Sequence, residues 1–400
     1  MVDFFIGEAL LGQESEIAHI DLIVGDKSGP VGQAFANGLV NLSQGHTPLL
    51  GVIKPNLTPK PHTLIVPKVT VKGLQQASLI FGAAQAAVAK AVADSLEEGI
   101  IPKNKADDWV IVCSVFVHPE AQSTHRIFHY NYGATRLALR RALRSYPPID
   151  KVLAEKDRAK HPILGYRPHT LWDPPYLQVA LDTGTIRSSI EVIKKLPQSE
   201  RIIIEVGTPL VKGAGIDSVV EAIRKIRIES YIIADMKTLD VGRAEVEIAA
   251  NATANAIVVS GQAPIETISD VIVESKKRGI DPWVDSLGTS PEQLLVELEG
   301  LLEKPKVFIL HRGIDQEASE TQRSWDLIKA VKEQLGCLVA VAGGIKPGKD
   351  LAEALEKSAD IVVVGRYIYR NPDPYQAATQ FLDYLGPEKE TMRLFDRIDY

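Results

Sequence analysis

Residues 201–242 read RIIIEVGTPLVKGAGIDSVVEAIRKIRIESYIIADMKTLDVG, and this stretch decides the fold of the larger part of the chain. It begins with an apolar run typical of a buried strand, continues through an amphipathic segment with helical spacing, and ends with a second apolar run. This order is one βα unit followed by the strand of the next. Right-handed crossovers make such strands parallel.

The same unit recurs regularly through the C-terminal part of the chain. Eight apolar strand-like runs follow one another, ending at Asp182, Gly207, Lys237, Gly261, Gly288, Gly313, Gly344 and Arg366. Eight consecutive βα units predict a closed (β/α)8 TIM barrel, and a doubly wound open sheet is the alternative. Polar residues at the ends of nearly all strands favour the barrel, because a barrel assembles one site from all of its strand ends.

The N-terminal part is less regular, and we expect an α+β domain there. Its predicted strands cover residues 18–24, 62–71 and 108–117, and its predicted helices cover residues 82–98 and 131–144.

The two parts are joined by a segment rich in proline and mixed charge, YPPIDKVLAEKDRAKHPILGYRPHTLWDPPY, with no sustained apolar period. We therefore expect a first domain over residues 1–145, a connector over residues 146–175 and a barrel over residues 176–400.

Composition excludes several classes of protein. The 400 residues include 45 basic and 51 acidic side chains, a net charge of -6, so a nucleic-acid partner is not expected. Cys113 and Cys337 both lie in apolar strand-like runs, which argues against a disulfide framework and favours a reducing cytoplasm. The N-terminus does not resemble a secretion signal, and no apolar run is long enough for a membrane span.

The third barrel strand ends in ADMKTLDVG, which places Asp235, Lys237 and Asp240 close together. Because side chains alternate along a strand, Asp235 and Lys237 share one face. A lysine between carboxylates stays protonated and can act as an acid or as an electrostatic clamp for an anionic intermediate. The alternative is a structural ion pair at the strand end.

Two further carboxylates, Asp182 and Glu205, end the first two strands. Alone, each could equally be a helix N-cap or a solvated loop residue, but together with Asp235 they offer oxygen ligands for one Mg²⁺ ion. His311 ends the sixth strand. At a barrel mouth that faces Lys237 and a metal, we favour a proton-transfer role over a structural one.

The last two strands end in AVAGGIKPG and VVVGRYIY. The loops at these positions form the phosphate site of many barrels, and Gly343, Gly344 and Gly365 permit close backbone approach. Since Arg366 adds a cation, a phosphorylated substrate is favoured.

From about residue 175 onward, the segments LDTG, IEVGTPLVKGAG, ADMKTLDVG, HRGIDQ and VAVAGGI resemble the 3-hexulose-6-phosphate synthases of the orotidine-monophosphate decarboxylase superfamily. The resemblance implies a magnesium-dependent aldol reaction in which an enediolate of ribulose 5-phosphate adds to formaldehyde. It assigns Mg²⁺ to Glu205 and Asp235, proton transfer to His311, and charge stabilisation to Lys237.

In the same resemblance, Asp182 orients Lys237 and the substrate hydroxyls. Asp240 reaches into the site of a partner subunit, which implies a barrel dimer. One departure concerns the phosphate site, since the family usually has two glycines after the last strand where this chain has Gly365 followed by Arg366.

In the N-terminal part, His19 and Asp21 share one face of a predicted strand, and Lys68 and Thr70 repeat that spacing on another. Gln85, near the start of an alanine-rich helix, could recognise a polar ring. A partly buried histidine with a carboxylate partner explains the first pair equally well.

The segments GEAL, AHIDLIVG, NGLVN, KPHTL, FGAAQ, EEGIIP and YNYGATRLALRRA, within residues 6–143, resemble the formaldehyde-activating enzymes. The resemblance implies condensation of formaldehyde with tetrahydromethanopterin, with His19 as the acid that protonates the departing hydroxyl. It also implies a fold like the second domain of ribosomal protein S5 and a homopentamer. The residues assigned to pterin contact are Asp21, Leu50, Lys68, Thr70 and Gln85.

We therefore expect a bifunctional, homo-oligomeric cytoplasmic enzyme whose two sites share formaldehyde, with the barrel releasing it from hexulose 6-phosphate and the first domain trapping it. The alternative is an N-terminal pterin or formaldehyde binding module fused to a 3-keto-L-gulonate-6-phosphate decarboxylase.

Overall fold

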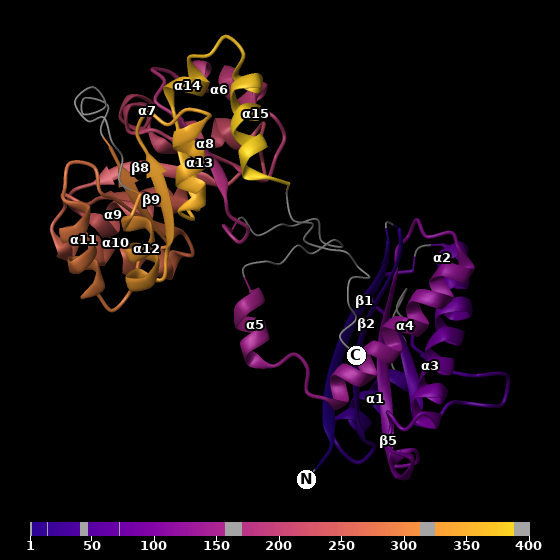
Figure 1. The fold of residues 1–400 in the computed structure, drawn as a ribbon. Coiled ribbons are helices and arrows are strands. Elements are labelled where there is room, and N and C mark those ends of the chain that lie inside the picture. Colours follow the sequence, from indigo (N-terminus) through magenta and orange to yellow (C-terminus); the bar gives the residue numbers. More distant parts are fainter. Residues whose placement is uncertain are drawn as a thin grey trace. The chain divides into compact units, whose positions relative to one another are not determined.

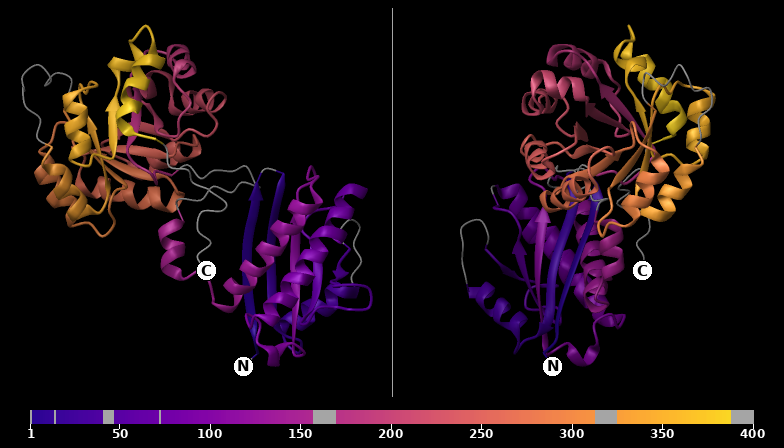
Figure 2. Two further views of the ribbon diagram at one scale, coloured as in Figure 1. Left: turned by 45° about the vertical axis from the view of Figure 1, so that its right-hand side comes forward. Right: turned by 90° about the vertical axis from the view of Figure 1, so that its left-hand side faces the viewer.

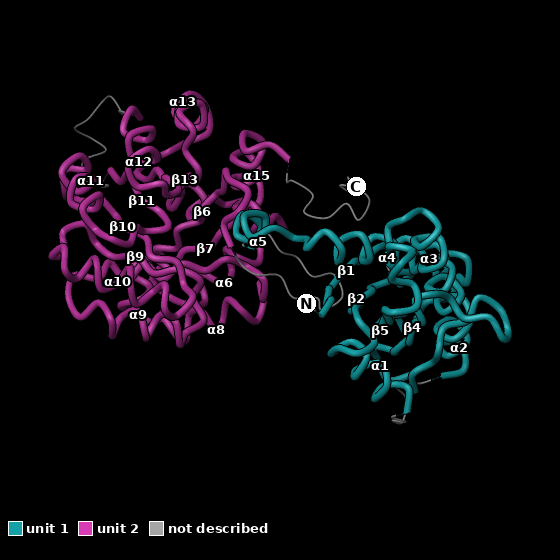
Figure 3. The backbone as a smooth tube through the Cα atoms, turned by 90° about the horizontal axis from the view of Figure 1, so that it is seen from below, with its two compact units in different colours: residues 1–156, 392–400 teal, residues 157–391 magenta. Residues whose placement is uncertain are grey.

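A computed structural model describes residues 2–13, 15–40, 47–71, 73–156, 170–312 and 325–387. The chain divides into two compact units (Figure 3), and the described residues of the first are 2–156 and those of the second 170–387. Each unit has its own apolar core and is described by itself.

The first unit is built on one five-stranded sheet with the strand order β1-β2-β5-β4-β3. Figure 1 labels the strands β1, β2 and β5 of this sheet. Neighbouring strands are antiparallel except for β4 and β5, which are parallel. The strands are β1 (Phe4–Gln13), β2 (Glu16–Asp26), β3 (Leu49–Leu50), β4 (His62–Pro67) and β5 (Trp109–Val117). With its helices, this unit confirms the predicted α+β class.

The helices α3 (Gln85–Glu97) and α4 (Thr124–Leu143) cover one face of this sheet. The alternation of β2 fits this arrangement, because Ile20 and Leu22 are buried toward the helices while His19 and Asp21 lie on the other face and are partly exposed. The α1 helix (Pro30–Val40) packs against β2, β5 and β4. Part of the face that carries His19 therefore stays open.

Several elements of this unit were not predicted, and some predicted boundaries were wrong. The β1 strand and the α1 helix were missed, because neither FFIGEALLGQ nor PVGQAFANGLV keeps a clear apolar period. The α4 helix begins at Thr124, well before the predicted start, because the Ser123 side chain accepts a hydrogen bond from the Arg126 backbone N–H and caps a polar first turn. The predicted connector contains the short α5 helix (Ile149–Glu155), and its residues 157–169 lie outside the described residues.

Contrary to the expectation that no apolar run has sufficient length, one segment, Leu74–Glu97, is long and apolar enough to cross a membrane by length and composition. It comprises α2 (Leu74–Ser78), the π-helical turn η1 (Leu79–Ala84) and α3. Most of its apolar window is buried, with Ile80, Val88 and Val92 in the core of the first unit. This burial is typical of the core helix of a soluble domain.

The second unit is a closed barrel of eight parallel strands (Figure 2), as predicted. Each predicted strand is present, in the order β6 (Tyr176–Leu181), β7 (Ile202–Val206), β8 (Ile232–Thr238), β9 (Ala256–Ser260), β10 (Asp281–Asp285), β11 (Val307–His311), β12 (Leu338–Ala342) and β13 (Ile361–Val364). Its described helices are α6 (Ile186–Lys195), α7 (Thr208–Ala214), α8 (Ile216–Arg224), α9 (Gly242–Asn251), α10 (Ile265–Arg278), α11 (Pro291–Glu299), α12 (Leu327–Leu335), α13 (Lys349–Glu356), α14 (Arg366–Tyr369) and α15 (Pro374–Leu385).

Inward-facing side chains change character along the barrel axis. Near the N-terminal ends of the strands they are apolar, and Tyr176, Ile203 and Trp283 belong to the cluster that fills the interior. Two residues further along the same strands, the inward positions become Gln178, Glu205 and Asp285. The polar layer therefore lies at the C-terminal mouth, where barrels carry their active sites.

We expect Gly7→Ala to destabilise the first unit, because a Cβ atom at this position of β1 would lie 2.0 Å from the backbone oxygen of Ala138 in α4. Overpacking of this kind costs roughly 1–3 kcal/mol of unfolding free energy, which urea denaturation measures. Gly82→Ala is the matched control, because nothing lies within 4 Å of its new methyl group. Equal stability of the two variants would contradict the close approach of β1 to α4.

Candidate active sites

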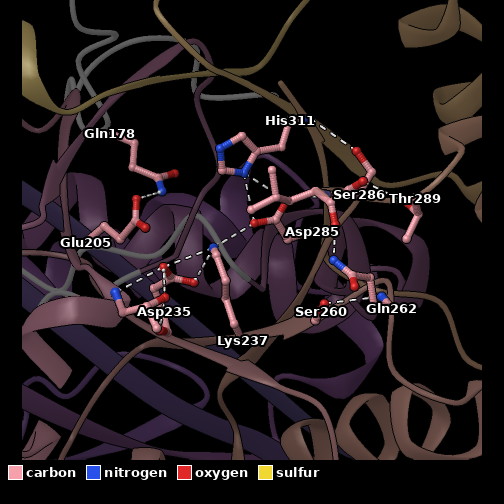
Figure 4. A network of polar contacts seen from close by, with 12 residues as sticks. Gln178, Glu205, Asp235, Lys237, Ser260, Gln262, Asp285, Ser286, Thr289 and His311 are labelled. Atoms are coloured by element: carbon pink, nitrogen blue, oxygen red, sulfur yellow. Dashed lines mark hydrogen bonds and ion pairs between the residues drawn. The ribbon is translucent and has the colours of Figure 1, made fainter. Parts of the chain in front are cut away.

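The ammonium group of Lys237 lies at the centre of a polar group in the barrel mouth (Figure 4). Its Nζ atom is 3.0 Å from Oδ1 and 3.1 Å from Oδ2 of Asp235, and 2.8 Å from Oδ2 of Asp285. Asp285 in turn lies 2.9 Å from Nδ1 of His311. These four side chains come from β8, β10 and β11 and form one continuous charged chain.

Electrostatics keep Lys237 and Asp285 ionised. Burial lowers the pKa of Lys237, but the carboxylates of Asp235 and Asp285 outweigh this effect and raise the pKa above its usual range. Burial raises the pKa of Asp285, but the hydrogen bond to His311 and the Lys237 ammonium group lower it to about 2. Lys237 is therefore a fixed cation, and Asp285 is a fixed anion that holds both the lysine and the histidine ring.

Strand geometry explains how Lys237 reaches both carboxylates. Its backbone has a φ angle of 46°, which lies in the left-handed region, and the pairing register of β8 shifts between Ala234 and Thr238. A non-glycine residue in this conformation is uncommon and is strained. The irregularity occurs at the residue whose side chain contacts one carboxylate of its own strand and one of β10, which is not adjacent to β8.

Two further carboxylates lie beside this chain. Glu205 is buried and accepts a hydrogen bond of 2.5 Å from Nε2 of Gln178, while Asp235 accepts one of 2.6 Å from Oγ1 of Thr208. Burial, and then the charge of Asp235, raise the pKa of Glu205 well above its usual range. Burial and Asp235 also raise the pKa of Asp182.

The buried carboxyl groups of Glu205 and Asp235 lie on neighbouring strands of this mouth. Glu205 and Asp235 offer hard oxygen donors on adjacent strands, and a divalent cation would balance their charge. The residues of this mouth therefore fit a divalent cation such as Mg²⁺, which Glu205 and Asp235 would hold.

The predicted phosphate residues follow the adjacent strands β12 and β13. Gly343 and Gly344 have φ angles of 105° and 60°, and a Cβ atom on Gly343 would lie 2.2 Å from the backbone oxygen of Arg312. Only glycine fits there without strain. Gly365 precedes the first residue of α14, Arg366, whose positive charge lowers the pKa of Asp182 against the larger effects that raise it.

Among the residues that the structure describes, Asp240, like the exposed Asp182, makes no hydrogen bond or ion pair with Lys237. It is exposed, and its Oδ1 atom accepts a hydrogen bond of 2.7 Å from the backbone N–H of Val241. The recorded contacts of Lys237 are with Asp235 and Asp285, so this chain does not bring Asp240 to its own lysine.

A second polar group lies on the open face of the N-terminal sheet. The Nε2 atom of His19 is 3.1 Å from Oε1 of Glu8 and 3.4 Å from Oδ1 of Asp21, and Lys68 forms an ion pair with Asp21. The register of β1 and β2 places Glu8 opposite Asp21. Ser114 lies opposite Asp21 on β5, and its small side chain leaves room for Lys68 to reach across.

The remaining predicted pterin residues lie at other positions in the first unit. Leu50 is on β3, which β5 and β4 separate from β2 and His19. Thr70 follows Lys68 beyond the end of β4. Gln85 is buried, and its Oε1 atom accepts a hydrogen bond of 2.6 Å from the backbone N–H of Val52, so its acceptor positions the segment after β3.

Sequence reasoning missed four residues that complete these groups: Glu8, Gln178, Thr208 and Asp285. Glu8 lies in β1, and its place opposite Asp21 follows only once β1 is paired with β2. Asp285 could have been predicted from the sequence, because it ends the fifth barrel strand much as Asp182 follows the first.

We expect Glu205→Gln to stabilise the barrel in metal-free buffer, and increasingly so as the pH rises. The pKa of Glu205 is higher in the folded state than in the unfolded state, where it is near 4.5. The carboxyl group therefore stabilises the fold below the unfolded-state pKa, and this stabilisation is lost as the pH rises toward the folded-state pKa. Urea denaturation between pH 5 and 9, with hydrogen exchange of barrel peptides, measures the difference.

The exposed Glu299→Gln in α11 is the control for Glu205→Gln and is expected to change the unfolding midpoint little. A difference between Glu205→Gln and the parent protein that stays constant from pH 5 to 9 would contradict the assigned electrostatics.

Comparison with known proteins matches two family models to the two parts of the chain. Residues 6–164 match the formaldehyde-activating enzyme (Fae) family, and residues 175–381 match the orotidine 5'-phosphate decarboxylase / HUMPS family. A solved structure described as 3-hexulose-6-phosphate synthase is 28% identical, covers 53% of this chain and 100% of its own, and has a TM-score of 0.46.

Full-length relatives described as "Bifunctional enzyme Fae/Hps" contain both parts in one chain. The protein from Methanococcoides burtonii is 54% identical over 97% of this chain and 98% of its own, and that from Archaeoglobus fulgidus is 49% identical over 98% and 99%. The protein from Methanothrix thermoacetophila is 53% identical over 96% of both chains. With this identity over nearly its whole length, the chain belongs to the family of bifunctional Fae/Hps enzymes.

Proposed function

We propose that this chain is a bifunctional lyase. Its N-terminal unit condenses formaldehyde with tetrahydromethanopterin to 5,10-methylene-tetrahydromethanopterin, and its barrel interconverts hexulose 6-phosphate with ribulose 5-phosphate and formaldehyde. The observation that carries the proposal is the presence of two separate histidine, lysine and carboxylate groups, one in each unit, in a chain that matches bifunctional relatives along nearly its whole length.

In the barrel, Glu205 and Asp235 would hold Mg²⁺. The bound ion supplies positive charge that stabilises a developing oxyanion. Lys237 adds a second fixed positive charge at the same place.

Asp285 holds Nδ1 of His311 and leaves Nε2 of this ring to exchange a proton with the substrate. In the cleavage direction, a hydroxyl proton leaves, the carbon–carbon bond breaks, formaldehyde departs, and the enediolate of ribulose 5-phosphate takes up a proton. Asp182, at the rim, would orient substrate hydroxyls.

The phosphate group would bind at the backbone of Gly343, Gly344 and Gly365, with Arg366 as its cation. These residues follow adjacent strands, and their glycine conformations permit close approach to an anion. Asp240, which is exposed in this chain, would complete the site of a second barrel in a dimer.

In the N-terminal unit, His19 would protonate the departing hydroxyl of the carbinolamine formed from formaldehyde and the pterin amine. The pterin would contact Asp21, Leu50, Lys68, Thr70 and Gln85. We assign this unit, residues 1–145, the fold of the second domain of ribosomal protein S5 and a homopentameric assembly with sites between subunits. Such sites are consistent with the distance that the sheet order puts between Leu50 and His19.

The two activities would share formaldehyde. The barrel, residues 176–400, releases it while making ribulose 5-phosphate, and the N-terminal unit traps it on the carrier in the cytoplasm. The connector at residues 146–175 would raise the local formaldehyde concentration at most. Net flux toward pentose phosphate follows from this pairing.

The test is formation of methylene-tetrahydromethanopterin from hexulose 6-phosphate, tetrahydromethanopterin and Mg²⁺ by the full-length protein. We expect His19→Ala to slow product formation to the spontaneous condensation rate while formaldehyde release continues. We expect Asp235→Ala to stop formaldehyde release, because it removes both a metal holder and a partner of Lys237.

Added formaldehyde is the control in this experiment, because it should restore product formation by Asp235→Ala to the rate of the parent protein. Unchanged formaldehyde release by Asp235→Ala would contradict the barrel assignment. An unchanged condensation rate in His19→Ala would leave the N-terminal unit as a binding module.

We also expect Glu8→Gln to slow the condensation up to about fivefold, because a contact between His19 and a half-exposed carboxylate is worth roughly 0.2–1 kcal/mol. Glu8→Asp should restore part of the rate. Glu97→Gln, an exposed change at the end of α3, is the control. If Glu8→Gln and Glu97→Gln have equal rates after subtraction of the spontaneous reaction, Glu8 does not assist His19.

A further inference from the structure

The barrel mouth contains a fully enclosed glutamine whose side-chain oxygen has no partner within the described part of the chain. Gln178 lies on β6 at an inward position and is 1% exposed. Its Nε2 atom donates the 2.5 Å hydrogen bond to Oε2 of Glu205. Its Oε1 atom is buried, and no described residue donates a hydrogen bond to it. In Figure 4 this oxygen points away from Glu205.

A buried hydrogen-bond acceptor without a donor lowers the stability of the folded protein. An unsatisfied buried polar group destabilises a protein by roughly 1–3 kcal/mol, and most such groups in folded proteins have a partner. The interior directly below Gln178 is apolar, so an apolar residue would pack at this position without the penalty. We therefore expect a bound ligand to supply the hydrogen-bonding partner of the Gln178 side-chain oxygen.

The orientation of the amide is fixed by Glu205. The hydrogen bond from Nε2 to Oε2 of Glu205 places the amide nitrogen on the side of the carboxylate. A flipped amide would place its oxygen against the carboxylate oxygen. The Oε1 atom is therefore held as an acceptor on the opposite side of the amide.

The partner must be a hydrogen-bond donor. Phosphate and carbonyl oxygens of a substrate are acceptors and do not suit Oε1. The Lys237 ammonium group already contacts Asp235 and Asp285. The donors that a sugar phosphate brings are its hydroxyl groups.

We propose that Gln178 is a specificity-determining residue that holds Glu205 through its Nε2 atom and accepts a hydrogen bond from one substrate hydroxyl through its Oε1 atom. The inference rests on the proposed barrel function and deepens it. A site built to pair with a particular hydroxyl rejects an analogue that lacks it, because the buried acceptor is then left unpaired.

The test compares ribulose 5-phosphate with its monodeoxy analogues, each lacking one hydroxyl, by calorimetry in the presence of Mg²⁺. The variant is Gln178→Met, which preserves length and approximate volume but has no amide oxygen. We expect one analogue to bind the parent protein at least roughly tenfold more weakly than ribulose 5-phosphate. Gln178→Met should bind these two ligands equally and keep its discrimination among the others.

The control is Gln293→Met, the same substitution at an exposed position of α11, which should bind every ligand as the parent protein does. Hydrogen exchange of barrel peptides checks the fold. Gln178→Asn, which withdraws the carbonyl by one methylene group, replaces Gln178→Met if that variant does not fold, and it should also lose the discrimination.

Two outcomes overturn the proposal. If Gln178→Met weakens every ligand by the same factor, the residue acts only through Glu205 or the metal. If it changes no affinity, another group satisfies the amide oxygen. Failure of the barrel function itself is distinguishable, because the parent protein would then neither bind ribulose 5-phosphate nor release formaldehyde from hexulose 6-phosphate.

Discussion

The ion pairs of Lys237 are the interaction on which the barrel site depends. Three buried carboxylates, Glu205, Asp235 and Asp285, come together at the mouth, with the exposed Asp182 beside them, and charges of one sign in a poorly solvated space repel strongly. One ammonium group lies between two of them and lets Asp285 stay ionised, and Asp285 in turn orients the ring of His311. Glu205 and Asp235 offer oxygen donors on adjacent strands, which suit a divalent cation.

The N-terminal unit uses the same residue types in a wetter setting. His19 lies between Glu8 and Asp21, and Lys68 offsets the charge of Asp21. Both carboxylates are about half exposed, so solvent screens their interactions more than those in the barrel. The buried charges of the barrel therefore suit the stabilisation of an anion. The sheet face needs only to hold the imidazole ring of His19 near a proton acceptor.

The sequence was sufficient to predict both fold and site where an apolar strand ends directly in polar site residues. All eight barrel strands and the pair of Asp235 and Lys237 could be predicted, because buried parallel strands are continuous apolar runs that end in polar residues. Glu8 and Gln178 could not be predicted. Glu8 depends on the pairing of β1, a strand without a clear period, and the role of Gln178 depends on which neighbour its amide meets inside a closed barrel.

The central claim is that the Lys237 charge makes the carboxylate cluster tolerable, and a double-mutant cycle on unfolding free energy tests it most directly. Lys237→Met should cost roughly 3–5 kcal/mol at pH 7, because it leaves buried charge uncompensated. Adding Asp285→Asn to Lys237→Met should recover much of that loss, since it removes one of the unpaired charges. A Lys237→Met protein as stable as its parent, or a double variant whose losses simply add, would contradict the account.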